Sequence, residues 1–174
     1  MRHPENGSVA EFAAASRVPV INGGDGANEH PSQALLDLFT IRSELAGRER
    51  DLDGLRIAMV GDLRYGRTVH SLSKLLSLFS NLRVSLVSPK ALKMPGEVVE
   101  SLREAGHEVL ETDALEQGIA DVDIVYSTRI QEERFASREE ADLYRGRFRL
   151  NQSCLLYTSP SPRDLSTSRM PSSA

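Results

Sequence analysis

Short aliphatic segments alternate with amphipathic helical patterns between residues 55 and 128, and this alternation constrains the fold more than any other feature. Four runs have the length and composition of buried strands: 55–60, 82–87, 107–112 and 122–128. Strands that alternate with helices form parallel sheets with right-handed crossover connections. We therefore predict an α/β fold with a Rossmann-like parallel sheet in the common order 3-2-1-4, with helices on both faces.

The segments between these strands predict the helices that cover the sheet. After the first strand, apolar residues recur at helical spacing: Val69, Leu72, Leu75, Leu76 and Phe79. A second helix over 96–106 ends at Gly106, a residue typical of helix C-termini. Asp113 is a suitable cap for a short third helix over 114–120.

The sequence before residue 55 and after residue 152 differs in character from this domain. Pro31 opens a helix over 31–45, on which Leu35, Leu38, Phe39 and Leu45 form an apolar stripe. Because 1–43 is too short to bury its own core, we interpret it as the end of a larger first domain plus an interdomain helix. The α/β domain then spans 44–152. Residues 153–174 are rich in Ser and Pro without periodicity, which predicts a disordered, non-native tail.

The motif GDLRYGRT, residues 61–68, joins the first strand to its helix. Its glycine spacing matches a phosphate-binding P-loop, except that Arg67 replaces the lysine. The start of a helix attracts anions, and the planar guanidinium fits two oxygens of one carboxylate or phosphate, whereas a P-loop lysine acts as a point charge. The motif therefore favours a carboxylate site. A P-loop, or a plain glycine turn with a solvated Arg67, remains an alternative, although the fourth strand lacks the magnesium-binding Asp that a P-loop needs.

The motif STRIQEER, residues 127–134, follows the fourth strand and carries Arg129 and Gln131. In the order 3-2-1-4 the first and fourth strands are neighbours, so Arg67 and Arg129 are expected to meet at one crevice. Two arginines and an amide donor describe a pocket for a small dicarboxylate. We interpret the other charged residues of the motif as solvent-exposed: Glu132, Glu133 and Arg134.

The motif EHPSQ, residues 29–33, places His30 and Gln33 three residues apart at the start of a helix. Both side chains can donate hydrogen bonds to an oxygen that gains charge during a reaction. The adjacent glycine-rich NGGDG allows a ligand to approach the backbone, although it is also a simple turn signal. A structural role for this histidine stays open.

Composition excludes several classes of function. The net charge of −4 argues against a nucleic-acid partner, which needs a basic surface. The other histidines, His3, His70 and His107, lack metal-ligand spacing, so we predict no metal site. The single cysteine, Cys154, cannot form an internal disulfide, and no apolar run is long enough to cross a membrane. These features favour a cytoplasmic protein.

Four segments together resemble aspartate carbamoyltransferases: RHPENG, VPVINGGDGANEHPSQALLDLFTI, MVGDLRYGRTVHSL and DIVYSTRIQEER. The resemblance extends from about Arg2 to about Leu150. It implies two α/β domains, a carbamoyl phosphate site in the first, an aspartate site in the second, and active sites shared within a homotrimer that a regulatory subunit can join. The implied reaction is carbamoyl transfer to the amino group of L-aspartate in pyrimidine synthesis, without a cofactor.

The resemblance also implies residue roles. Arg2, His30 and Gln33 match residues that contact carbamoyl phosphate, with His30 and Arg2 acting on the carbonyl and phosphate oxygens during catalysis. The aspartate carboxylates are bound by residues that match Arg67, Arg129 and Gln131. Ornithine carbamoyltransferase, a relative with the same fold, has a different motif after the first strand and no TRIQ.

The sequence departs from the family in ways that predict a fragment. The phosphate-binding Ser-Thr-Arg-Thr-Arg motif, expected upstream, and the His-Pro-Leu-Pro loop, expected downstream, are both missing. The run RHPENGSVAEFA also differs from the usual RHP-x-x-G-A-A-R. We therefore expect this chain to be inactive by itself. The alternatives are a non-catalytic α/β module that binds dicarboxylates or amino acids, or another carbamoyltransferase such as ornithine carbamoyltransferase.

Overall fold

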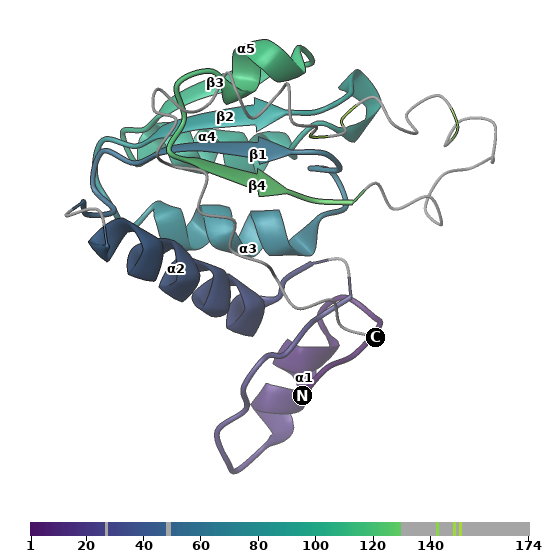
Figure 1. Cartoon of the computed structure of the whole chain (residues 1–174). Helices are drawn as coiled ribbons and strands as arrows, with labels where there is room; N and C mark the ends of the chain where they lie inside the picture. Colours follow the sequence, from purple (N-terminus) through teal and green to yellow (C-terminus); the bar gives the residue numbers. More distant parts are fainter. Residues whose placement is uncertain (27, 48–49, 130–141, 143–147, 149, 151–174) are drawn as a thin grey trace, which may run out of the picture.

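The computed structural model describes residues 1–26, 28–47, 50–129, 142, 148 and 150, and a parallel sheet forms its centre (Figure 1). Within this part of the chain the sheet has four strands: β1 Arg56–Val60, β2 Arg83–Val87, β3 Glu108–Thr112 and β4 Ile124–Ser127. Their order is β3-β2-β1-β4, which confirms the predicted topology. Gln131 and the predicted tail over 153–174 lie outside the described residues.

The register aligns the carboxyl ends of the two central strands with that of β4. Val60, the last residue of β1, pairs with Val87 of β2 and with Ser127 of β4. The loops that follow β1 and β4 therefore leave the sheet side by side. The predicted meeting of the GDLRYGRT and STRIQEER motifs depends on this register.

Helices cover both faces of the sheet, as predicted (Figure 1). On one face lie α3 Arg67–Leu76 and α4 Gly96–Glu104, which bury a large apolar core with Ile57, Met59 and Leu86. The opposite face carries the short α5 Leu115–Ile119, whose Ile119 packs with Ala58 and Val60. Because successive β1 residues point to opposite faces, one strand supplies both cores.

The helix α2 Pro31–Ala46 packs against α3, and its buried face differs from the predicted stripe. Ala34, Ile41 and Leu45 are buried, whereas Leu35 and Phe39 are 58% and 68% exposed. Leu38 is partly buried against the core. The apolar stripe is therefore only partly buried here, because contact with α3 covers one side of the helix and leaves Leu35 and Phe39 exposed.

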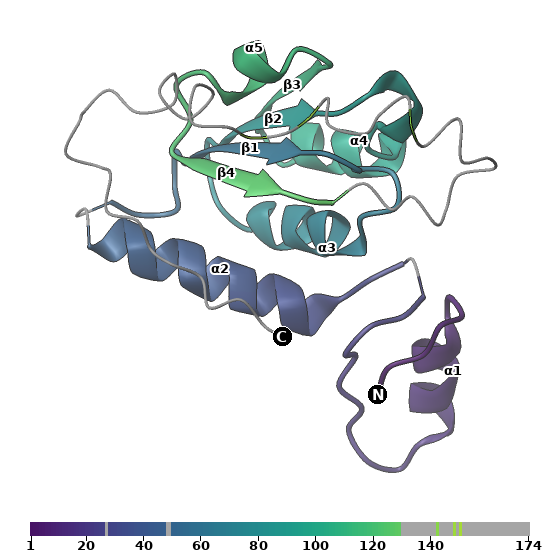
Figure 2. The ribbon, with the colours of Figure 1, turned by 45° about the vertical axis from the view of Figure 1, so that its right-hand side comes forward.

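The first segment of the chain forms a separate small unit beside the amino end of α2, away from the sheet (Figure 2). It contains α1 Ser8–Ala15 and a loop in which His3 pairs with Asp25 through a β-bridge. Farther along, the 3-10 turn η1 Lys90–Leu92 follows β2.

Two predicted helix ends have different outcomes. Gly106 adopts a positive φ of 83° directly after the α4 C-cap, as expected for a glycine that ends a helix. Asp113 was wrongly expected to cap α5, because Ala114 occupies the N-cap position and no side chain caps the helix. Instead, the Thr112 hydroxyl oxygen accepts a hydrogen bond from the Ala114 backbone N–H.

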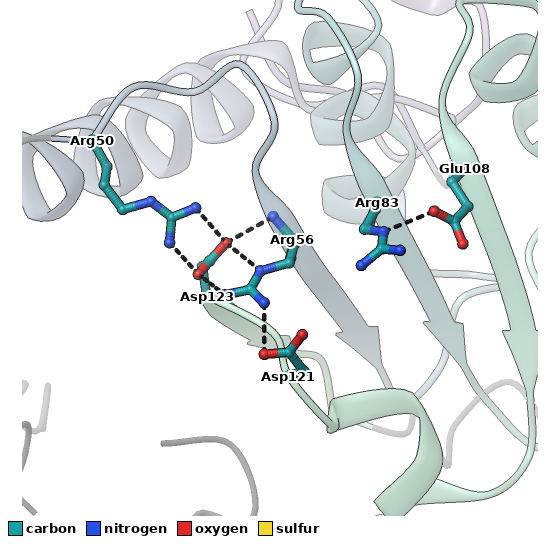
Figure 3. Close-up of polar contacts among 6 residues, drawn as sticks. All are labelled: Arg50, Arg56, Arg83, Glu108, Asp121 and Asp123. Carbon is teal, nitrogen blue, oxygen red and sulfur yellow. Dashed lines mark hydrogen bonds and ion pairs between the residues drawn. The ribbon is translucent and has the colours of Figure 1, made fainter. Parts of the chain in front are cut away.

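A cluster of ion pairs ties the amino ends of β1 and β4 together (Figure 3). The Asp123 carboxylate accepts hydrogen bonds from the backbone and guanidinium of Arg56, at 2.8–3.1 Å, and from the guanidinium of Arg50. Arg56 also pairs with Asp121 at 2.6 Å. Asp123 thus joins the connection after α2 to both strands. This cluster lies at the amino ends of the strands, opposite to the loops at their carboxyl ends.

No helix in the described part of the chain is long and apolar enough to span a lipid bilayer.

Candidate active site

A cavity of about 610 Å³ lies at the carboxyl ends of β1 and β4. Three parts of the chain line it: the end of the GDLRYGRT motif, the end of β4 with the two residues after it, and the small first unit. The lining residues of the sheet domain are Tyr65, Gly66, Arg67, Thr68, Tyr126, Ser127, Thr128 and Arg129, and those of the first unit are Arg2, His3, Pro4 and Gly26.

Gly61 allows the two loops of the sheet domain to meet. Its φ is 117°, and a Cβ atom there would lie 2.3 Å from the carbonyl oxygen of Thr128. Thr128 in turn donates its backbone N–H to the Val60 carbonyl oxygen at 2.8 Å. Only glycine fits this conformation and this close contact, so the first glycine of the motif sets where Arg129 leaves the sheet.

Arg67, at the start of α3, reaches across to the first unit. Its Nη1 donates a hydrogen bond to the Gly26 carbonyl oxygen at 2.7 Å. A Cβ atom at Gly24 would lie 3.3 Å from Arg67 Nη1 and 3.4 Å from Arg2 Cγ, so a glycine there leaves room for both side chains. The cavity therefore carries Arg2 and Arg67 close together, with Arg129 on the same lining.

His30 occupies the N-cap position of α2, and its hydrogen bonds fix its tautomer. The Gln33 backbone N–H donates to His30 Nδ1 at 3.3 Å, so Nδ1 is the acceptor and Nε2 carries the proton. The backbone N–H of His30 donates to Ser71 Oγ of α3 at 2.9 Å, which attaches this histidine to the helix that begins at Arg67.

The surroundings of His30 favour the neutral ring. Burial lowers the pKa of His30, and the positive charges of Arg67 and Arg2 lower it further. A neutral imidazole with a proton on Nε2 can donate a hydrogen bond to a carbonyl oxygen that gains negative charge. Neither His30 nor Gln33 is among the residues that line the cavity, although both arginines that influence His30 are.

Sequence reasoning missed a hydrogen-bonded group beside the cavity. Asp37 of α2 accepts a hydrogen bond from Gln33 Nε2 at 2.9 Å and another from the Tyr126 hydroxyl at 2.7 Å. Burial raises the pKa of Tyr126 to about 12, and the hydrogen bond to Asp37 also raises it. The spacing of Gln33 and Asp37, one helical turn apart, was a usable signal for the first contact. Nothing in the sequence predicts the second.

Among the residues that the structure describes, no three or more His, Cys, Asp or Glu side chains are grouped so that they could hold a metal ion. The charged groups at the cavity are instead arginines. The arrangement is therefore suited to anionic ligands with carboxylate or phosphate oxygens.

Two family models match the chain. The carbamoyl-phosphate-binding domain of aspartate/ornithine carbamoyltransferases matches residues 1–43, and the Asp/Orn-binding domain of the same enzymes matches residues 53–162. The second match extends beyond residue 153, where the sequence predicts the start of a tail.

Curated relatives and solved structures agree with these matches. The chain is 72% identical over 158 residues to the aspartate carbamoyltransferase catalytic subunit of Saccharophagus degradans, and 69% identical to that of Cellvibrio japonicus. These alignments cover 91% of this chain and 46% of each relative, so the chain spans about half the length of the curated relatives it matches.

Two solved structures illustrate the likeness in fold. The catalytic subunit of M. jannaschii aspartate transcarbamoylase superimposes with a TM-score of 0.77 at 43% identity, covering 88% of this chain and 49% of that one. The Trypanosoma cruzi enzyme in complex with carbamoyl phosphate and aspartate gives a TM-score of 0.80 at 39% identity, covering 92% of this chain and 52% of that one.

Proposed function

Because the chain belongs to the aspartate/ornithine carbamoyltransferase family, we propose that it is part of an enzyme that transfers a carbamoyl group from carbamoyl phosphate to L-aspartate. The products are N-carbamoyl-L-aspartate and phosphate, and the reaction belongs to pyrimidine synthesis. The observation that carries the proposal is the arginine-lined cavity between the first unit and the sheet domain.

The charge of the cavity supports aspartate over ornithine as the acceptor amine. Arg2, Arg67 and Arg129 line it, and the lining within the described part of the chain contains no Asp or Glu. A dicarboxylate gains bidentate pairs with such guanidinium groups, whereas the cationic side chain of ornithine is repelled. Arg67 and Arg129, with Gln131 beyond the described residues, are the proposed ligands of the aspartate carboxylates.

Carbamoyl phosphate is proposed to bind next to Arg2, His30 and Gln33. The Nε2–H of neutral His30 donates to the carbamoyl oxygen, and Arg2 stabilises negative charge on that oxygen or on the phosphate. The neutral amine of aspartate attacks the carbamoyl carbon. The new C–N bond forms, the C–O bond to phosphate breaks, and the departing phosphate takes the proton that the nitrogen loses.

Orientation and electrostatics account for the catalysis in this scheme. The donor is already an activated acyl phosphate and no oxidation occurs, so no cofactor is needed. The enzyme gains most of its effect by holding two substrates in reacting geometry and by aiming donors at the developing oxyanion.

The organisation of the whole enzyme follows as part of the proposal. Residues 1–43 are proposed as the end of the carbamoyl phosphate domain with its interdomain helix, and 44–152 as the aspartate domain. Exposed apolar side chains on α1 and α2, such as Phe12, Leu36 and Phe39, offer surfaces for the rest of that first domain. A cytoplasmic homotrimer, with or without a regulatory subunit, is the proposed assembly.

A segment exchange tests the substrate assignment. Residues 1–150 of this sequence replace the matching segment in the full-length Saccharophagus degradans relative, and carbamoylation of L-aspartate and of L-ornithine is measured. We expect turnover with aspartate and at least a hundredfold lower kcat/KM with ornithine, about 3 kcal/mol of discrimination. A folded exchange protein that uses ornithine equally well contradicts the assignment to aspartate.

The non-catalytic alternative has its own test. Calorimetry on the 174-residue chain measures succinate binding with and without carbamoyl phosphate. Saturable binding of succinate to the chain, together with an inactive exchange protein, favours a dicarboxylate-binding module over the enzyme.

A further inference from the structure

Each oxygen of the Asp37 carboxylate accepts a hydrogen bond from one of the two proposed substrate regions. Its Oδ1 accepts from the Gln33 amide Nε2 at 2.9 Å, and its Oδ2 accepts from the Tyr126 hydroxyl at 2.7 Å. Gln33 is a proposed contact of carbamoyl phosphate, and Tyr126 lines the arginine cavity shortly before Arg129. A half-buried acidic side chain therefore stands between the two regions without lining the cavity itself.

The chemistry of the carboxylate dictates how Gln33 is turned. An ionised carboxylate has only acceptors, so it fixes the amide with its NH2 group toward Asp37. The Gln33 carbonyl oxygen Oε1 then faces away from Asp37 as an acceptor for a ligand. A carbamoyl group carries an NH2 donor that this oxygen can meet, whereas an acetyl group carries a methyl in the same place.

We propose that Asp37 is a positioning residue that makes the site prefer carbamoyl phosphate over acyl phosphates without an N–H donor. Asp37 does so by orienting the Gln33 amide so that its oxygen Oε1 can accept a hydrogen bond from the carbamoyl NH2 group. Its second hydrogen bond anchors the end of β4, and thus the start of the Arg129 loop, to α2. This inference rests on the proposed carbamoyl transfer and adds a determinant of donor specificity to it.

The neighbours of Tyr126 keep its hydroxyl in the donor role. The pKa of Tyr126 is raised to about 12 by burial and by Asp37, while a hydrogen bond from Thr68 opposes the rise. The phenol therefore stays protonated at all pH values where carbamoyl phosphate is used. Thr68 follows Arg67 directly, so this chain of contacts also ends at the proposed aspartate site.

Donor preference in the exchange protein tests the inference. In the full-length exchange protein with residues 1–150, kcat/KM is measured with carbamoyl phosphate and with acetyl phosphate, for the unsubstituted protein and for Asp37→Asn. An asparagine side chain offers both a donor and an acceptor, so the Gln33 amide can rotate by 180° and exchange its NH2 group and its oxygen. We expect the ratio of carbamoyl to acetyl phosphate kcat/KM to fall about tenfold or more.

The control is Glu44→Gln, which removes a carboxylate from an exposed position of the same helix. Its ratio should equal that of the unsubstituted protein. If Asp37→Asn lowers kcat/KM equally for both donors, Asp37 is only structural and the inference is overturned. If the unsubstituted exchange protein transfers no carbamoyl group, the proposed function fails and the inference fails with it.

A measurement on the 174-residue chain tests the hydrogen bonds without any catalysis. Asp37→Asn should lower the pKa of Tyr126 from its raised value, followed by NMR of selectively labelled tyrosine, and should shift the side-chain NH2 resonances of Gln33. The Glu44→Gln control should change neither signal. Unchanged Tyr126 and Gln33 signals in Asp37→Asn overturn the inference even where the exchange protein is active.

Discussion

Replacing Asp123 by Asn should remove much of the stability that the ion-pair cluster gives to the sheet (Figure 3). Burial alone would raise the pKa of Asp123, but the hydrogen bonds from Arg56 and Arg50 outweigh it and bring the pKa from 3.8 to about 2. The Asp123 side chain is only 8% exposed, so solvent screens these bonds weakly. The shift corresponds to about 2 kcal/mol of unfolding free energy at neutral pH.

The pH dependence of this loss follows from the sign of the shift. Because the folded pKa is lower than the unfolded value of 3.8, the contribution is complete well above pH 4 and disappears as the pH falls toward 2. Urea unfolding should therefore show that Asp123→Asn costs about 2 kcal/mol at pH 7 and about 1 kcal/mol at pH 3.

An ion pair in the same region provides the control. Glu108 pairs with Arg83 at 2.8 Å, but both side chains are more than half exposed, at 69% and 60%. Glu108→Gln should cost no more than about 0.5 kcal/mol. Equal losses in the two variants, or a loss in Asp123→Asn that is the same at both pH values, would refute the reasoning.

Two further substitutions test residues around the cavity. Gly61→Ala should cost about 2 kcal/mol or more of unfolding free energy in urea, because the positive φ of Gly61 and the nearby Thr128 carbonyl oxygen exclude a Cβ. The control is Gly96→Ala, where nothing lies within 4 Å of the added Cβ, and it should be neutral or stabilising. Equal effects of the two substitutions would contradict the role given to Gly61. Arg67→Gln should raise the pKa of His30, measured by imidazole NMR, because the guanidinium charge lowers it. The same substitution should raise the KM for aspartate in the exchange protein about tenfold or more while the Kd for carbamoyl phosphate changes little, and an unchanged KM would contradict the assignment of Arg67.

The sheet could be predicted from the sequence because its signals are local. Each strand is a short aliphatic run, and the order of a parallel sheet follows from few rules, which sufficed to place Arg67 and Arg129 on neighbouring loops. The exposure of Leu35 and Phe39 could not be predicted, since it depends on which side of α2 meets α3. The contact of Tyr126 with Asp37 spans 89 positions and leaves no periodic trace.

Local chemistry explained part of the candidate site and missed the rest. The position of His30 at the start of a helix was visible in EHPSQ, but its tautomer became clear only from the hydrogen bond that it accepts from the Gln33 N–H. The position of Gly24 beside Arg2 and Arg67 likewise became visible only in the structure, because the glycine-rich NGGDG is also a common turn sequence. The roles of the six predicted site residues stay predictions.

The position of β1 in the sheet also makes the cavity depend on two loop closures of very different length. β1 pairs on one side with β2, the next strand to be synthesised, and on the other with β4, which follows only after α4, β3 and α5. Closing that longer loop costs more conformational entropy than closing the loop between β1 and β2. Because Thr128 and Arg129 follow β4 directly, the cavity is complete only when β4 is paired with β1. A partly folded chain that still lacks β4 would therefore lack the side of the cavity that Ser127, Thr128 and Arg129 line.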